Sequence, residues 1–173
     1  GKRDYAILLM VTRLGLRASD IKALRFKNIK WDTNTIEIIQ HKTRNAVVLP
    51  LLKDIGWALI EYLKNGRPQT ASDHVFVRHN APYEEFAPNA AMNRILVKYI
   101  RQAGVKIKRD VPLGLHSLRH TLASTMLAQD VPLETISEFL GHMSVKSTDI
   151  YLHIDFKRLW ECALDADGVA CHE

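Results

Sequence analysis

Cysteine is scarce in this sequence, with two among 173 residues. Cys162 and Cys171 both lie near the C-terminus and do not form a CxxC pair. The sequence therefore supports neither a disulfide framework nor a zinc site, and it fits a reducing cytoplasm.

Long hydrophobic runs are also missing. No apolar run reaches the roughly 18 residues that span a bilayer, and the N-terminal residues lead into a helical pattern without a signal-peptide cleavage site. We therefore expect a soluble, cytoplasmic protein with no membrane partner. With 47% hydrophobic residues, the chain can bury one good core, and we predict a single domain over residues 1–173.

Metal-binding patterns are absent as well, although the sequence contains eight histidines. No HExxH or H-x-H-x-D pattern occurs, and the carboxylates near His116 and His142 are not spaced as ligands. We expect no catalytic metal and no cofactor.

Acidic residues are missing between Phe86 and Asp110, where basic residues are frequent. That stretch contains Arg94, Lys98, Arg101, Lys106, Lys108 and Arg109, and a second basic group contains Lys22, Arg25, Lys27 and Lys30. Either group alone is explained as well by a solvated helix face. Together, in a chain of net charge +5 and without balancing carboxylates nearby in sequence, they favour contact with the phosphates of double-stranded DNA.

Hydrophobic periodicity predicts a mainly α fold with a small antiparallel β-sheet, of the α+β class. Helices are predicted over residues 7–14, 19–24, 54–64, 89–103, 115–126, 132–141, 144–151 and 156–164. Strands are predicted at 35–40 and 46–49, joined by a basic hairpin tip at 41–45, and a third strand at 74–77. Gly15 and Gly141 are expected to end helices, Ser19 to cap the second, and Pro132 to take a first helical position.

His116 and Arg119 lie three residues apart at a predicted helix start. They are expected beside the apolar stripe of that helix, which consists of Leu115, Leu118, Leu122 and Met126. Such a pair can grip one phosphate, because arginine presents a charged planar fork and histidine exchanges a proton near neutrality. A helix-capping or surface role explains the pair equally well, and His120 fits either the core or a supporting role.

Other polar residues have ordinary explanations when each is taken alone. Arg17, in a bend between two helices, is suited to cap the carbonyls of the preceding helix. Asp20 is suited to a first-turn anion or to holding Arg17. Lys42 would keep an edge hairpin soluble, and Tyr151 would be a core or interface aromatic.

In combination, these segments resemble the catalytic domain of the tyrosine recombinase, or phage integrase, family. The matching stretches are Gly15-Leu16-Arg17-Ala18-Ser19-Asp20, Gln40-His41-Lys42-Thr43, Val48-Leu49-Pro50-Leu51, His116-Ser117-Leu118-Arg119-His120-Thr121, Leu140-Gly141-His142 and Thr148-Asp149-Ile150-Tyr151. They occur in the family's order over residues 2–164. The resemblance implies the tyrosine recombinase catalytic fold.

The resemblance also implies the site residues. Catalytic roles fall on Arg17, Lys42, His116, Arg119, His142 and the nucleophile Tyr151, with Asp20 and His120 in support. Tyr151 would form a 3′-phosphotyrosyl link to DNA without metal or ATP. Arg44 is the nearest competitor for the role of Lys42. The expected DNA contacts are Lys22, Arg25, Lys27, Arg44, Arg94, Lys98 and Arg101.

The resemblance further implies partners and boundaries. The N-terminal core-binding domain of whole family members has no counterpart here, so we expect an excised catalytic domain. The apolar face of the tail, residues 155–173, is expected to pack on its own domain or to dock on a neighbouring protomer of a DNA-bound tetramer. A directionality factor is a further possible partner, and a bacterial, nucleoid-associated location is expected.

Several functions share these features. We favour the integrase of a mobile element or phage over a Xer-like chromosome or plasmid resolvase. A type IB topoisomerase uses similar chemistry but swivels a single nick. A non-enzymatic helix-turn-helix module, built on the helices from Leu133 to Tyr151, would explain the basic charge but not Arg17, Lys42 and Tyr151 together.

Overall fold

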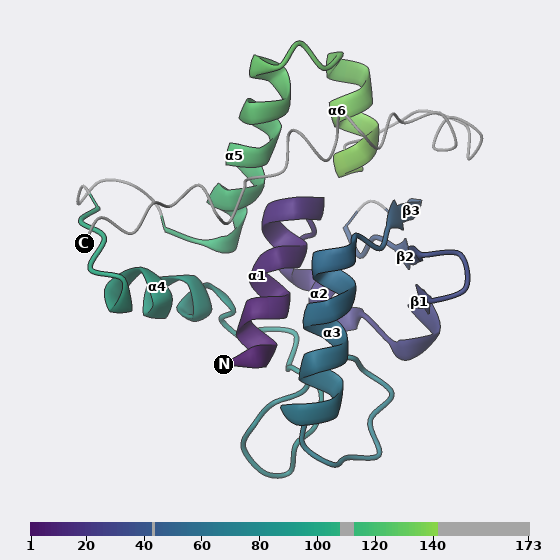
Figure 1. Cartoon of the computed structure of the whole chain (residues 1–173), viewed down its shortest axis with the longest axis vertical. Coiled ribbons are helices and arrows are strands. Elements are labelled where there is room, and N and C mark those ends of the chain that lie inside the picture. The colour runs from purple at the N-terminus through teal and green to yellow at the C-terminus, as the bar shows by residue number, and fades with distance from the viewer. Residues whose placement is uncertain (43, 108–112, 142–173) are drawn as a thin grey trace.

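Helices dominate the part of the chain that the computed structural model describes, residues 1–42, 44–107 and 113–141 (Figure 1). They are α1 Lys2–Leu14, α2 Ala18–Ala23, α3 Lys53–Asn65, α4 Asn93–Gln102, α5 Leu115–Ala128 and α6 Leu133–Leu140, with a 3-10 helix at Phe26–Asn28. Strands β1 Ile29–Lys30, β2 Thr35–Ile39 and β3 Ala46–Pro50 form an antiparallel sheet in the order β1-β2-β3. The predicted mainly α fold with a small antiparallel sheet is confirmed. Within these residues no helix is long and apolar enough to cross a membrane.

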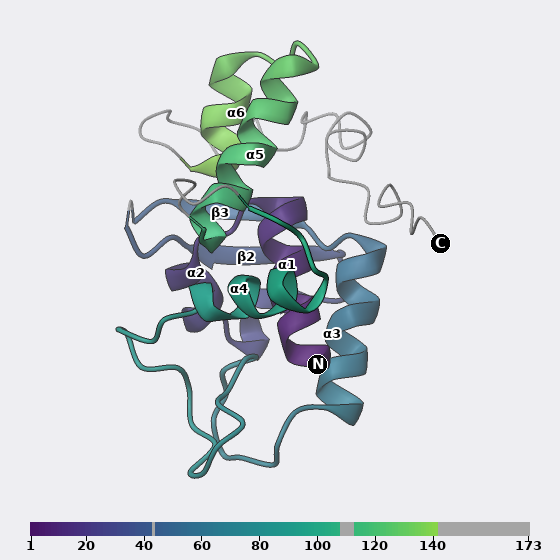
Figure 2. The same ribbon diagram turned by 90° about the vertical axis from the view of Figure 1, so that its left-hand side faces the viewer.

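Helix α1 lies at the centre of this arrangement. It packs against α3 and α5, with the sheet on one side and α4 on the other, and α5 and α6 stand above its C-terminal end (Figures 1 and 2). Its buried residues include Ala6, Ile7 and Met10, which recur at helical spacing and face the common core. Near its start, Tyr99 of α4 donates a hydrogen bond from its hydroxyl to Asp4 Oδ2 at 3.2 Å.

The predicted hairpin is confirmed in β2 and β3. Ile36 lies opposite Leu49 and Ile38 opposite Val47, and all four side chains are buried on the core face of the sheet. At its end, the main-chain N–H of Gln40 donates to Asn45 O at 2.9 Å, and Arg44 N–H donates to Gln40 O at 2.9 Å. These bonds close the loop that carries Lys42.

The predicted strand at residues 74–77 is wrong. The third strand of the sheet is Ile29–Lys30, whereas residues 74–77 make only isolated bridges, such as that of His74 with Arg25. Val75, Phe76 and Val77 are all buried, so a run of apolar residues was mistaken for a strand. The Arg67 side chain satisfies three carbonyls of this region, those of Ser72, His74 and Val75, in place of a strand ladder.

Three helix starts differ from the prediction. Arg17, rather than Ser19, caps α2, because the Arg17 carbonyl already accepts the N–H groups of Asp20 and Ile21. Helix α4 begins at Asn93 rather than near residue 89, after a turn in which Ala90 N–H donates to Ala87 O. Pro132 is the N-cap of α6 and precedes its first helical residue.

The glycines predicted to end helices do so. Gly15 has φ +61 and Gly141 has φ +65, the left-handed conformation in which glycine has no steric penalty. The predicted helices 144–151 and 156–164, and the tail 155–173, lie outside the described residues.

Gly15 also marks a close approach between α1 and α6, which predicts the effect of its replacement. A Cβ at Gly15 would lie 2.5 Å from Leu140 Cδ2, whereas a Cβ at Gly104, with φ +67, would meet nothing within 4 Å. Gly15→Ala should therefore lower the free energy of unfolding by more than Gly104→Ala, for which only the left-handed backbone costs about 1 kcal/mol. Urea unfolding followed by circular dichroism measures both; equal losses would contradict the close approach.

Candidate active site

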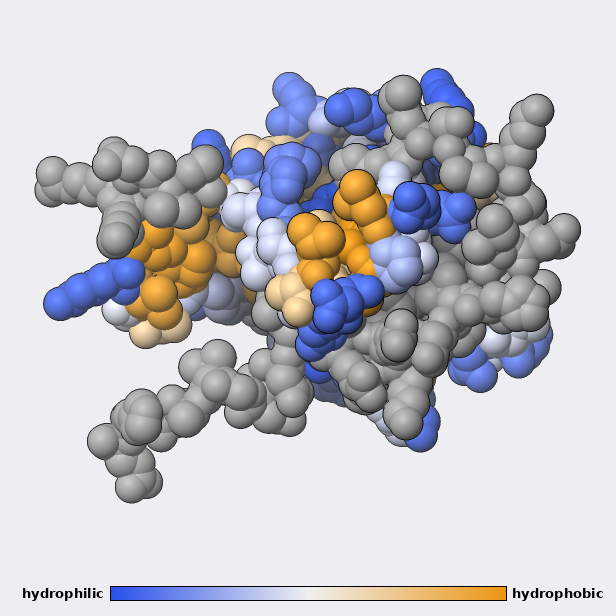
Figure 3. Space-filling view, turned by 90° about the horizontal axis from the view of Figure 1, so that it is seen from above, coloured by the Kyte–Doolittle hydropathy of each residue, from blue (hydrophilic) through white to orange (hydrophobic). Residues whose placement is uncertain are grey.

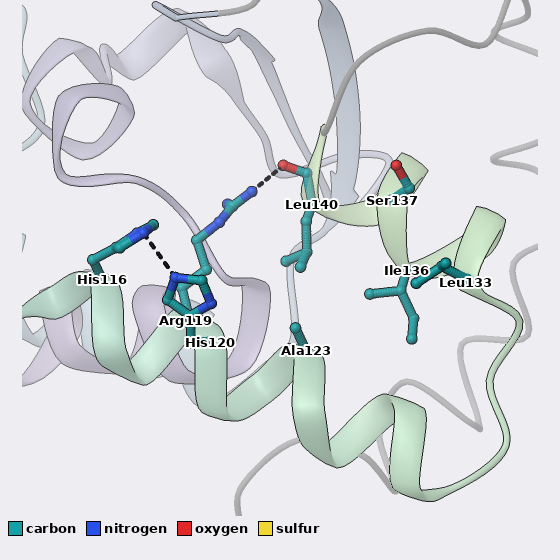
Figure 4. A pocket seen from close by; sticks show the side chains of 8 residues that line it. All are labelled: His116, Arg119, His120, Ala123, Leu133, Ile136, Ser137 and Leu140. Carbon is teal, nitrogen blue, oxygen red and sulfur yellow. Dashed lines mark hydrogen bonds between the residues drawn. The ribbon is translucent and has the colours of Figure 1, made fainter.

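A cavity opens between α5 and α6, above the end of α1. Its lining residues are His116, Arg119, His120, Ala123, Leu133, Ile136, Ser137 and Leu140, and its volume is about 320 Å³. Figure 4 shows the polar end of this cavity, formed by the two histidines and Arg119, facing the apolar residues of α6. Figure 3, seen from above, shows hydrophobic residues on the surface at this end of the molecule. Leu127 of α5 and Leu133 of α6 are both exposed.

Arg119 lies inside the protein, with 3% of its surface exposed. Its Nη1 donates to Gly15 O and its Nη2 to Leu140 O. The expectation that Arg119 lies beside the apolar stripe is wrong, because it takes a place within the buried face of α5, between Leu115 and Leu122. Its guanidinium therefore joins the end of α1 to the end of α6.

Arg17 approaches the same place from the bend before α2. Its Nη1 donates to Gln40 Oε1 at 2.7 Å, and its Nη2 donates to Gly141 O at 3.3 Å. Arg119 therefore caps the carbonyl of Gly15 at the end of α1. Arg17 instead binds Gln40 of the hairpin and Gly141 at the end of α6. Two arginines distant in sequence bind consecutive carbonyls, Leu140 O and Gly141 O.

Helix ends explain why two like charges can lie together here. The last carbonyls of a helix have no partner within the helix and carry partial negative charge, which favours cations. The pKa of Arg119 is nevertheless lowered to about 10, first by burial and then by the charge of Arg17, with Asp20 acting in the opposite direction. Arg119 remains charged at neutral pH.

His116 and His120 form a pair one helical turn apart on α5. Their Nε2 atoms lie 2.8 Å apart, so one ring donates a hydrogen bond and the other accepts it. The pKa of His116 is lowered, first by burial and then by the charges of His120, Arg119, Lys42 and Arg17. A neutral His116 at physiological pH is suited to accept a proton.

Within the described residues, the Asp20 side chain binds the hairpin and not the Arg17 guanidinium. It is 4% exposed, and its Oδ1 accepts the main-chain N–H of His41 at 2.8 Å. Within the described ranges, its Oδ2 has no hydrogen-bond partner. Lys42 follows His41 at the exposed tip, and its charge contributes to the lowered pKa of His116. Asp20 thereby anchors the base of the loop that presents Lys42.

Gln40 is the residue of this site to which the sequence assigned no role. It is 1% exposed, and its side chain contacts Arg17 and Leu140 O. A glutamine at the end of a strand has no periodic signal, and its partners are distant in sequence. The one sequence signal for Gln40 was its position in the stretch Gln40-His41-Lys42-Thr43, which contains the predicted catalytic Lys42.

The predicted DNA contacts lie on several surfaces and remain predictions. Carboxylates remote in sequence nevertheless balance some of the basic residues, because the fold brings Asp73 to 2.8 Å from Arg25, and Asp4 to 3.8 Å from Lys98. Lys22 Nζ donates to Pro88 O at 2.7 Å, and burial lowers its pKa. The other predicted contacts, Lys27, Arg44, Arg94 and Arg101, are exposed.

The remaining predicted catalytic residues, His142 and Tyr151, lie outside the described residues. In the sequence, His142 follows Gly141, whose carbonyl binds Arg17. Of the six predicted catalytic residues, the structure brings together Arg17, Arg119 and His116 and places Lys42 on the adjoining hairpin.

Sequence comparison identifies the family. The model of the phage integrase family matches residues 1–158. The chain is 39% identical over 168 residues to "Putative integrase/recombinase y4gC" of Sinorhizobium fredii, which covers 97% of this chain and 85% of that protein. It is 32% identical over 165 residues to tyrosine recombinase XerC of Oceanobacillus iheyensis, covering 93% of this chain and 52% of the relative.

Solved structures have the same fold. The crystal structure of XerA recombinase matches 92% of this chain with a TM-score of 0.68 and 26% identity, and the match spans 56% of that chain. The catalytic core of lambda integrase, at 15% identity and a TM-score of 0.60, supports the fold alone. The chain therefore spans about half the length of the XerC and XerA relatives. It belongs to the phage integrase family of tyrosine recombinases, a class of DNA strand-transferring enzymes.

Proposed function

We propose that this chain is the catalytic domain of a site-specific DNA recombinase that cleaves and rejoins double-stranded DNA. The observation that carries this proposal is the convergence of the Arg17 and Arg119 guanidiniums on the carbonyls of Leu140 and Gly141. Charged donors held at one point suit a phosphodiester, whose non-bridging oxygens gather charge in the transition state. A helix-turn-helix reader alone would leave this convergence unexplained.

In the proposed reaction, the phenolic oxygen of Tyr151 attacks phosphorus and forms the 3′-phosphotyrosyl bond while the bond from phosphorus to the 5′-oxygen breaks. His116 accepts the phenolic proton, and Lys42 donates a proton to the departing 5′-oxygen. Arg17 and Arg119 bind the non-bridging oxygens, and His142 adds a hydrogen bond. Attack by a free 5′-hydroxyl reverses these steps and rejoins the strand.

Each guanidinium carries five N–H donors and, within the described part of the chain, uses two of them on protein acceptors. A bound phosphate would use other donors or replace a carbonyl. Because the carbonyls hold the arginines in place before DNA arrives, little reorganisation is needed when charge develops on the phosphate.

An integrase-type recombinase of a mobile element is the specific assignment that we propose. The integrase/recombinase relatives of Sinorhizobium fredii are 39%, 34% and 38% identical to this chain, whereas the XerC relative is 32% identical. A solved structure of the XerH site-specific recombinase, which is 27% identical to this chain, has palindromic difH substrate bound. This relative supports double-stranded DNA as the partner. Assembly into a tetramer through residues 155–173, with a directionality factor, is part of the same proposal.

Replacement of the nucleophile tests the core of this proposal. Tyr151→Phe should abolish the covalent adduct with a nicked DNA substrate, because phenylalanine has no attacking oxygen. The adduct is measured by denaturing gel electrophoresis in the presence of EDTA, which should leave the wild-type reaction unchanged. Tyr83→Phe, at an exposed tyrosine, is the matched control and should form the adduct normally. An adduct in Tyr151→Phe would remove Tyr151 as the nucleophile.

A change of leaving group separates the roles of Lys42 and Arg119. A 5′-phosphorothiolate expels a thiolate, which needs no proton, so it should restore cleavage by Lys42→Ala. Arg119→Ala should stay slow on both substrates by about 10² to 10³, the usual cost of one preorganised donor. Single-turnover cleavage rates measure both variants. Arg44→Ala is the control for the competing cation, and restoration of Arg119→Ala to the same degree would undermine both assignments.

The lowered pKa of His116 predicts the pH dependence of cleavage. Since the neutral ring accepts the proton, the rate should fall on acidification only below the ordinary histidine value of 6.5. His120→Gln removes a neighbour whose charge lowers the pKa of His116, so the acidic fall should move to higher pH. Adduct rates from pH 5 to 8 measure the shift, with His79→Gln as a control. An unchanged profile in His120→Gln would argue against His116 as the proton acceptor.

A further inference from the structure

Gln40 lies where three segments of the candidate site meet. Its side-chain Oε1 accepts the hydrogen bond from Arg17 Nη1 at 2.7 Å, and its Nε2 donates to Leu140 O at 3.3 Å. Its main chain closes the hairpin that carries Lys42. A single buried amide thus connects the hairpin, the bend before α2 and the end of α6.

Close packing constrains the Gln40 side chain as well as its hydrogen bonds do. A Cβ built on Gly141 would overlap the side-chain amide of Gln40, so the amide lies directly against the main chain at the end of α6. Arg17 binds the carbonyl of that same Gly141. The amide therefore lies against both the Arg17 guanidinium and the main chain of Gly141, where α6 ends.

The chemistry of an amide also suits this place. Arg17 and Arg119 repel each other: the pKa of Arg119 is lowered first by burial and then by the charge of Arg17. An amide oxygen can orient the Arg17 guanidinium without cancelling the positive charge that a phosphate needs, whereas a carboxylate would pair with that charge. The amide nitrogen supplies the donor for Leu140 O, which a carboxylate lacks.

We propose that Gln40 is a positioning residue of the recombinase, which holds Arg17 in the orientation that binds a non-bridging oxygen of the scissile phosphate. This role rests on the proposed function. Gln40 contacts no substrate itself and acts through the Arg17 guanidinium. A misplaced guanidinium slows the chemical step, because the transition state requires the donor at a defined point.

A substrate with reduced charge distinguishes this role from a general effect on folding. In a methylphosphonate, a methyl group replaces one charged non-bridging oxygen, so the task of neutralising that charge is removed. Gln40→Met keeps the length of the side chain without its polar atoms. It should slow adduct formation on the phosphodiester by about 10- to 100-fold, as expected for a misplaced catalytic group, and the defect should shrink strongly on the methylphosphonate, as it should for Arg17→Ala.

Two further variants complete the experiment. Arg17→Ala combined with Gln40→Met should be no slower than Arg17→Ala alone, since both changes remove one interaction. Gln40→Glu keeps an acceptor for Arg17 but adds a negative charge, and it should be slower than Gln40→Met on the phosphodiester. Gln69→Met, at an exposed glutamine, is the matched control and should cleave both substrates as the wild type does. Thermal unfolding shows that each variant is folded.

The outcomes separate the two proposals. If the wild type forms no adduct, the proposed function fails and the role of Gln40 fails with it. If the wild type forms the adduct, but Gln40→Met is unimpaired or equally slow on both substrates, the positioning role alone is overturned. A Gln40→Met defect confined to the charged phosphate supports it, provided that adding Gln40→Met to Arg17→Ala causes no further slowing.

Discussion

The site depends on keeping two guanidiniums together before any phosphate is present. Arg119 is buried at the contact between α1 and α6, and its pKa is lowered first by this burial and then by the charge of Arg17. The carbonyls of Gly15, Leu140 and Gly141 make this possible. They belong to helix ends, where acceptors lack helical partners and the helix dipole favours positive charge. The cations stabilise the helix ends as the helix ends stabilise the cations.

This arrangement places structural and functional demands on the same atoms. The left-handed glycines at residues 15 and 141 end their helices, and Arg119 binds a terminal carbonyl of each, Gly15 O and Leu140 O. A longer α1 or α6 would satisfy these carbonyls within the helix and remove the acceptors for the arginines. The precise ends of the two helices are therefore part of the proposed phosphate site, although neither glycine has a side chain to take part in chemistry.

The sequence predicted most of the elements, because their signals are local. Gly15, Gly141 and the alternation of Ile36, Ile38, Val47 and Leu49 identify helix ends and a hairpin without knowledge of the rest of the fold. Strand Ile29–Lys30 was missed, since two residues show no alternation. The segment 74–77 was mistaken for a strand because buried loops and buried strands are equally apolar.

The site was predictable in its residues but not in its contacts. The order of the motifs singled out Arg17, Lys42, His116 and Arg119, but the burial of Arg119 depends on contacts with Gly15 and Leu140, which lie 104 and 21 residues away. Gln40 was missed for the same reason, since its partners lie 23 and 100 residues away. Charge balance could not be predicted from the sequence where the fold brings a remote carboxylate to a basic residue, as at Arg25 and Asp73. His142 and Tyr151 stay predictions.

The contact between Gln40 and Gly141 also limits how sequences of this kind can diverge. The amide of Gln40 fills the volume that a side chain at residue 141 would need. A larger residue at 141 would require a smaller one at 40, and that exchange would remove the acceptor of Arg17. The two positions should therefore covary among homologues, and a lineage that changes one without the other should also change how its first arginine is held.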